Sequence, residues 1–119
     1  MTEYVVFIPG NEAEWEASTQ EKRDAAYARH REFAERLAAG GHRVTAGAEL
    51  THSAAGKVVR AEGDSGTVGD GPYFDTADQI TGFYVIESDD HDGLLEIVGH
   101  LAGAEGAIEV RGCVDHSSG

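Results

Sequence analysis

The stretch that decides the fold is Asp70 to Glu87, DGPYFDTADQITGFYVIE, because it joins a turn to a strand. Its first residues, Asp70-Gly71-Pro72, have turn chemistry: Gly frees φ, Pro fixes it, and Asp bonds nearby amides. Ile80 to Glu87 is rich in aromatic and β-branched residues, which favour a central strand. The segment therefore predicts a turn that leads into the middle of a β-sheet.

A first strand and a long helix are predicted before this segment. Residues 3–8 (EYVVFI) are apolar and β-branched, which indicates a buried strand. The helix is expected to begin at Ser18 or Thr19, where a hydroxyl can cap it. From Ala26 to Ala38, apolar residues recur at three- and four-residue spacing and form one stripe. That stripe contains a histidine, His30.

The elements together predict an α+β fold. The others expected are a strand over 43–50, a hairpin of 57–61 and 66–69, a helix from 89–90 to 103–106, and a strand over 107–111. The resulting order is a ferredoxin-like split βαβ arrangement with an extra hairpin, whose antiparallel sheet carries two helices on one face. Residues 1–119 are expected to form a single domain, with residues 112–119 as a flexible tail.

The second face of this sheet needs cover, because a chain of 119 residues has no third layer to spare. A second copy of the same sheet is the simplest cover. The sequence therefore predicts a two-fold homodimer.

The acidic composition limits the partners of the protein. With 22 acidic and 9 basic residues the formal net charge is −13, and the basic residues form no patch. Binding to nucleic acid or to anionic membranes is not expected for such a surface. The lone Cys113 cannot form an internal disulfide, and the N-terminus does not resemble a signal peptide, so a cytoplasmic protein is expected.

The deciding stretch closely resembles the signature of the YCII-related, DGPF-type family. The identical positions are Asp70, Gly71, Pro72, Thr76, Gln79, Gly82 and Tyr84. Counterparts in the expected order extend the resemblance over residues 3–112. The resemblance implies a dimeric α/β-barrel fold, shared with small lyases, isomerases and monooxygenases. Some members lie beside genes for alternative sigma factors, which implies a link to transcription control.

A second resemblance concerns chemistry. The stretch ARHREFAERL is similar to a helix of YCII proteins whose histidine points into a cleft and works with an acidic residue, which implies this role for His30. Those relatives have Asp-Pro after the second helix, where this chain has Leu101-Ala102. The acid must therefore come from elsewhere, and the candidates are Glu49, Asp70 and Asp75.

The candidate catalytic residues are His30 and Asp70. A neutral imidazole in a dry cleft suits general acid-base work, and burial would raise the pKa of Asp70 toward a useful range. Each also has a structural interpretation. His30 can be a core or interface histidine, and Asp70 can simply bond the amides of its turn.

Other side chains are candidates for substrate binding. They are Tyr73, Tyr84, Phe83, Glu49 and Arg60. Phe83 and Tyr84 are neighbours on a strand and point to opposite faces, so at most one of them faces the cleft. Trp15 lies in a polar segment, where it can act as a lid or cap the end of the barrel. The six histidines have no metal-binding spacing, so neither a metal nor another cofactor is expected, although three of the histidines could still converge in space.

Two functions remain open. The first is a cofactor-free lyase, isomerase or dehydratase that acts on a small metabolite, with His30 moving the proton and Tyr84 or Tyr73 binding a substrate oxygen. The second is a non-catalytic dimeric module that binds a ligand or regulates transcription. Oxygenase activity is a third, less supported option. Strongly anionic substrates are not expected unless Arg60 or Arg111 lies at the site.

Overall fold

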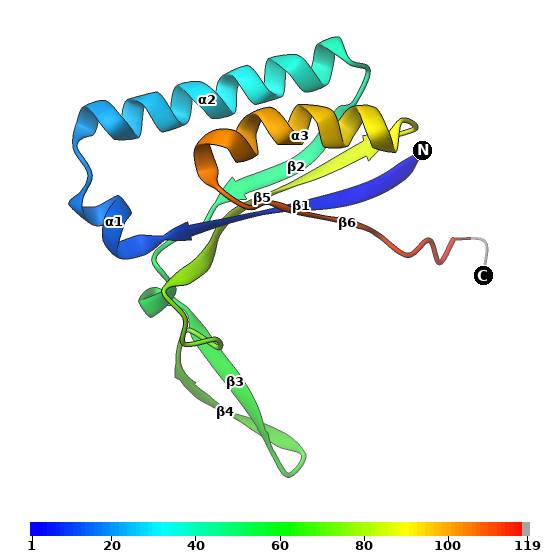
Figure 1. Ribbon diagram of the computed structural model, residues 1–119. Helices are drawn as coiled ribbons and strands as arrows, with labels where there is room; N and C mark the ends of the chain where they lie inside the picture. The colour runs from blue at the N-terminus through cyan, green and yellow to red at the C-terminus, as the bar shows by residue number, and fades with distance from the viewer. Residues whose placement is uncertain (118–119) are drawn as a thin grey trace.

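A four-stranded antiparallel sheet forms the body of the protein in a computed structural model that describes residues 1–117. Its strands are β1 (Thr2–Asn11), β2 (Arg43–Glu49), β5 (Asp78–Ser88) and β6 (Glu109–Gly112), in the order β2-β5-β1-β6. Helices α2 (Gln20–Ala39) and α3 (His91–Glu105) lie side by side on one face (Figure 1). This arrangement confirms the predicted α+β, ferredoxin-like fold.

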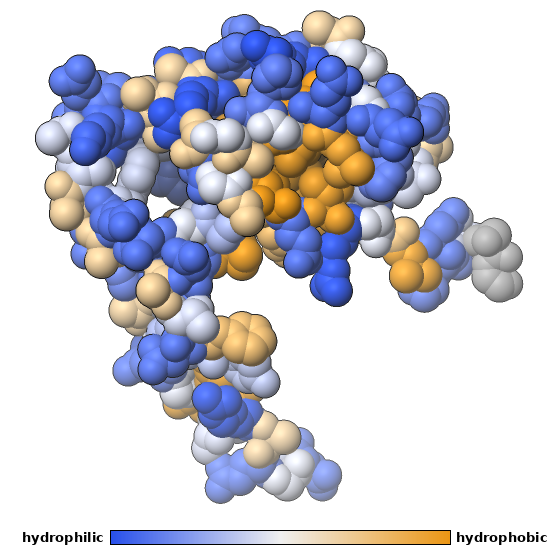
Figure 2. All heavy atoms as spheres, in the orientation of Figure 1, coloured by the Kyte–Doolittle hydropathy of each residue, from blue (hydrophilic) through white to orange (hydrophobic). Residues whose placement is uncertain are grey.

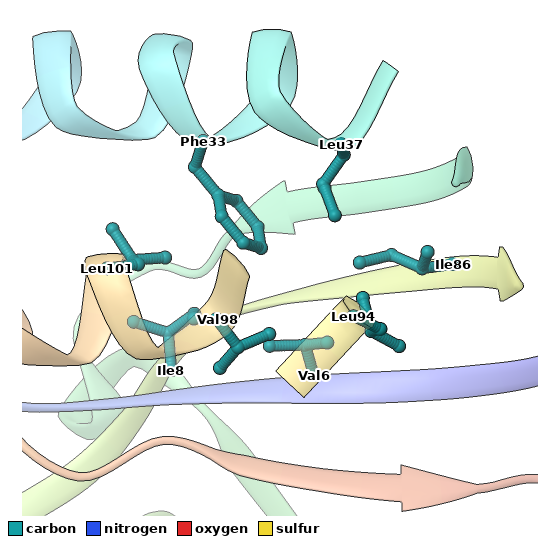
Figure 3. Close-up of a cluster of buried hydrophobic side chains, with 8 residues drawn as sticks. All are labelled: Val6, Ile8, Phe33, Leu37, Ile86, Leu94, Val98 and Leu101. Atoms are coloured by element: carbon teal, nitrogen blue, oxygen red, sulfur yellow. The ribbon is translucent and has the colours of Figure 1, made fainter. Parts of the chain in front are cut away.

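The hydrophobic core lies between the helices and the sheet (Figure 3). Phe33 and Leu37 descend from α2, while Leu94, Val98 and Leu101 come from α3. They meet Val6 and Ile8 of β1 and Ile86 of β5, which alternate with residues on the other face. Burial of each such side chain contributes about 1.5–3 kcal/mol, so this layer holds α2 at a fixed position over the sheet.

The helices differ from the prediction at one point. A short helix, α1 (Glu12–Ala17), occupies the polar segment around Trp15, and the Asn11 side chain caps it. Helix α3 runs through Gly103 to Glu105 and ends at Gly106, whose φ of 94° favours glycine. Thr19 caps α2 by accepting a bond from Lys22 N–H, as expected. No helix within residues 1–117 is long and apolar enough to cross a membrane.

The extra hairpin forms an arm outside the body. Strands β3 (Lys57–Glu62) and β4 (Ser65–Asp70) pair only with each other and turn at Gly63. The arm projects on the side of the sheet away from the helices (Figure 1). It raises the radius of gyration to 16.6 Å, against about 13.5 Å for a compact chain of this length.

The sheet face opposite the helices carries apolar side chains in two rows across the strands. One row consists of Ala46, Val85 and Val5, and the other consists of Ala48, Phe83 and Phe7. We call these six residues the open face. None of the six is buried, although Val6 and Ile86 on the other face are. A second apolar layer is therefore missing from the single chain.

The predicted tail begins inside the fold. Gly112 is the last residue of β6, and the Cys113 N–H donates to the Glu3 carbonyl at 2.8 Å. Residues 118–119 of the predicted tail lie outside the described residues.

Candidate functional site

A cleft of about 900 Å³ opens between α1, the N-terminal half of α2 and the adjoining ends of β1, β2 and β5. It exists because two positions that face α2 are glycines: Gly47, which pairs with Tyr84, and Gly82, which pairs with Ile8. Without side chains there, the space between helix and sheet is not filled as it is in the core. The sheet backbone thus forms part of the cleft floor.

Three side chains from three elements form a chain of hydrogen bonds at one end of the cleft. His30 Nδ1 of α2 lies 2.8 Å from the Tyr84 hydroxyl of β5. His30 Nε2 lies 3.1 Å from Glu105 Oε1 at the end of α3. A carboxylate only accepts, so Nε2 carries a proton; in the neutral imidazole Nδ1 is then unprotonated and accepts the Tyr84 O–H. We call this arrangement the relay.

The relay is shielded but reachable. The side chains of His30 and Glu105 are 25% and 19% exposed, and Tyr84 is partly buried. Packing fixes the phenol, because its ring lies edge-on to Phe33 at 5.2 Å and close to parallel with His30 at 6.0 Å. The groups therefore face the cleft from a rigid wall.

The charge state of the relay follows from its contacts. The hydrogen bond from His30 lowers the pKa of the Glu105 carboxyl, and Arg29, at 3.7 Å, lowers it further. Burial raises the pKa of the Tyr84 phenol, and the charge of Glu105 adds to that rise. At neutral pH the relay therefore contains a carboxylate and a protonated phenol on either side of the imidazole.

A second polar pair lies in the same cleft. The Tyr27 hydroxyl of α2 donates to Glu49 Oε1 of β2 at 3.1 Å, and this bond raises the pKa of the phenol. The Trp15 ring meets Tyr27 edge-on at 5.7 Å. This end of the cleft thus combines a carboxylate with two aromatic rings.

Helix α1 forms one wall of the cleft and is tied down at both ends. The Ser53 N–H donates to Glu12 at 2.7 Å, and the Ser53 hydroxyl bonds the same carboxylate. The Arg23 guanidinium donates to the Trp15 carbonyl at 2.9 Å and the Glu16 carbonyl at 3.1 Å. Arg23 thereby satisfies carbonyls at the C-terminus of α1.

The structure gathers only some of the residues predicted for the site. His30, Tyr84, Glu49 and Phe83 line the cleft, although Phe83 occupies a position on the open face, opposite to Tyr84. Trp15, the predicted lid, lines it from α1.

Four other candidates lie elsewhere and do not line the cleft: Asp70, Asp75, Tyr73 and Arg60. Asp70 accepts from Lys57 at 2.6 Å on the arm, and Arg60 lies over the Tyr73 ring at 5.9 Å. In the single chain, the loop of the DGPF-type signature is therefore separate from the relay.

The acid beside His30 is Glu105, which was not among the predicted candidates. Its spacing offered a signal, because residues 94, 98, 101 and 105 follow the three- and four-residue pattern of one helix face. Glu105 lies within residues 103–106, where the helix was predicted to end, and it was therefore not counted on that helix face. Tyr27 was likewise assigned to the apolar stripe without a polar partner.

Comparison with known proteins gives a family match. A family model described as the YCII-related domain matches residues 2–115, nearly the whole chain. No curated protein matches the chain significantly. Within residues 1–117, no three His, Cys, Asp or Glu side chains are placed to hold a metal ion together.

Proposed function

The chain belongs to the YCII-related family, and from that premise we propose that its cleft binds a small metabolite and transfers a proton to or from it. The observation that carries this proposal is the relay, because three ionisable groups from α2, α3 and β5 meet beside an accessible cleft. The reaction is that of a cofactor-independent lyase, isomerase or dehydratase.

Each group of the relay has a role. Tyr84 contacts the substrate, and its phenol either donates a hydrogen bond to a substrate oxygen or passes a proton. When the substrate loses a proton to the Tyr84 oxygen, the phenol proton moves to His30 Nδ1, and Glu105 stabilises the imidazolium. The raised pKa of Tyr84 favours a concerted transfer, because a free phenolate would be costly in this partly buried position near the negative charge of Glu105.

We further propose that the protein is a homodimer joined through the open face. The two rows of apolar side chains leave an apolar surface of the kind that a second sheet would cover. The arm supports this, since it projects on the same side and carries exposed Val59 and Val68, while the loop that follows it carries exposed Tyr73 and Phe74. A two-stranded hairpin alone is only marginally stable in water, so contacts with a partner would stabilise it.

Solvent-deuterium exchange tests proton transfer without knowledge of the net reaction. Metabolites are incubated with the protein in D₂O, and the loss of carbon-bound proton signals is followed by NMR. We expect one class of compound to exchange with the wild type and to exchange at least about 100-fold more slowly with His30→Gln, the usual cost of losing an acid-base group.

The matched control for this experiment is His100→Gln, because His100 lies on α3 and does not line the cleft. Its exchange rate should equal that of the wild type. A compound that binds in the cleft but exchanges no protons, or exchanges them equally with His30→Gln, would contradict the proposal. Binding without exchange would instead support a non-catalytic ligand-binding or regulatory module.

A further inference from the structure

The cleft has two chemically different ends. At the relay end, the Tyr84 hydroxyl and the imidazole of His30 can exchange hydrogen bonds with an oxygen of the ligand. At the other end, Glu49 offers a carboxylate, and Tyr27 and Trp15 offer aromatic rings that are 40% and 37% exposed. Carboxylates and the faces of Trp and Tyr are the groups that bind cations.

The charges along the cleft do not suit an anion. Five carboxylates line it, from Glu12, Glu14, Glu16, Glu49 and Glu105, against three permanent cations, from Lys22, Arg23 and Arg29. Arg29 lies beside Glu105, and Arg23 is bound to backbone carbonyls of α1. Arg60 and Arg111, which could have bound an anion, do not line the cleft.

One cation lies close to the aromatic end. The Arg23 guanidinium is 5.4 Å from the centre of the Trp15 ring, so it covers part of the indole. Its charge is offset within the cleft, because the carboxylates of Glu12, Glu14, Glu16 and Glu49 also line it, against the further cations of Lys22 and Arg29. The local balance therefore remains negative and favours a positively charged group.

The backbone sets the separation of the two ends. Tyr84 pairs with Gly47, and Gly82 pairs with Glu49, so the ends are two residues apart along β2 and β5. That offset is about 7 Å along a strand. On α2, Tyr27 and His30 are three residues apart, which is about 4.5 Å along the helix.

From these observations we propose that the cleft selects a small molecule with an ammonium group and a neutral oxygen, hydroxyl or carbonyl, about 5–7 Å apart. Glu49, Tyr27 and Trp15 bind the ammonium group, and Tyr84 bonds the oxygen. The inference rests on the proposed function in one respect: the oxygen lies where the relay can move a proton.

Three probes with the same four-carbon spacer next to the hydroxyl group separate the charge of the ligand from its shape. They are 4-aminobutan-1-ol, its neutral isostere pentan-1-ol, and the anion 5-hydroxypentanoate. Dissociation constants come from amide shifts of Gly47 and Gly82 and the Trp15 indole signal in ¹H–¹⁵N spectra. We expect the amine to bind about tenfold more tightly than either other probe, the usual gain from a cation at aromatic rings and a carboxylate.

Glu49→Gln should remove the preference for the amine and leave the binding of pentan-1-ol unchanged. The matched control is Glu21→Gln, because Glu21 lies in the first turn of α2 and outside the cleft lining; it should keep the preference. Equal or tighter binding of 5-hydroxypentanoate, a preference that survives Glu49→Gln, or no binding of any probe would overturn the inference.

The same titration with His30→Gln separates this inference from the proposed function. The variant should keep its preference for the amine, because His30 lies at the other end of the cleft. If deuterium exchange fails while the preference holds, proton transfer alone is refuted. If exchange occurs but the anion binds best, the ligand class alone is refuted.

Discussion

Glu105 is the residue that gives the histidine of α2 a defined chemical state. It lies at the last position of α3, and its carboxylate is within hydrogen-bond distance of His30 Nε2. The same carboxylate is close to Arg29. One side chain thus orients the imidazole, fixes its tautomer and compensates a nearby cation.

The lowered pKa of Glu105 makes stability depend on pH. Because the pKa of Glu105 is lower in the folded than in the unfolded state, the carboxylate stabilises the fold fully above about pH 4.3. This stabilisation is lost as the pH falls through the folded pKa. Glu105→Gln should lower the free energy of unfolding by roughly 1 kcal/mol at pH 7, and by much less at pH 3. Urea unfolding at both pH values measures this. An equal loss at pH 3 would show that packing, not charge, is responsible.

The phenols of Tyr84 and Tyr27 should ionise late. Both have pKa values raised above 10, Tyr84 by burial and Tyr27 by its bond to Glu49. In an absorbance titration at 295 nm, Tyr84→Phe should remove one of the phenols that ionise at a higher pH than an ordinary tyrosine. When the wild type is unfolded in guanidinium chloride, this high-pH ionisation should disappear. If Tyr84→Phe instead removed a phenol that titrates in the ordinary range, the Tyr84 ring would have to lie in water and not near the Glu105 carboxylate.

Residues of the site could be predicted from the sequence only where a local sequence pattern indicated them. His30 was found because it lies on an apolar stripe within a stretch similar to YCII proteins, and Tyr84 because its phenol can bind a substrate oxygen. The contact between His30 and Tyr84 joins residues 54 positions apart, which no spacing reveals. Glu105 was missed because the glycines beside it suggested a helix end.

Among the elements, α1 depends on neighbours more than on its own sequence. It has six residues, none of them buried, and helices this short are unstable alone. Its contacts with Ser53 and Arg23 are therefore what hold it at the cleft. This also explains why no helix was predicted for this polar segment, which has little periodicity.

Arg23→Met should loosen α1 while keeping the aliphatic part of the side chain. Trp15 is the only tryptophan, so its fluorescence reports on α1 alone. We expect acrylamide to quench Trp15 more strongly in this variant, because the guanidinium no longer covers part of the indole or donates to the Trp15 carbonyl. Arg31→Met, on the exposed part of α2, is the matched control. Unchanged quenching in a folded Arg23→Met protein would mean that α1 is held by other contacts.

The whole molecule is unusually open for a single chain. It measures 49 × 48 × 18 Å, and Figure 2 shows the arm standing clear of the body. The order of strands and helices followed from local patterns. The direction of the arm did not, because the turns at its base have no periodic signal and the arm has few contacts with the sheet.

Phe7→Glu tests the proposed dimer. Phe7 lies in the open face, and a charge there would be buried between two sheets without a partner, at a cost of several kcal/mol. Light scattering should give twice the chain mass of 12.6 kDa for the wild type and the single mass for this variant. Leu95→Glu, on the exposed side of α3, should leave the dimer intact. A monomeric wild type would refute the dimer.

The relay is tested most directly by the tautomer of His30. Long-range ¹H–¹⁵N correlation spectra at alkaline pH, where neutral imidazole predominates, distinguish a protonated from an unprotonated ring nitrogen. We predict a proton on Nε2, bonded to Glu105, and an unprotonated Nδ1 that accepts from Tyr84. Glu105→Gln should weaken this preference. A proton on Nδ1 in the wild type, or rapid exchange between both tautomers, would contradict the relay.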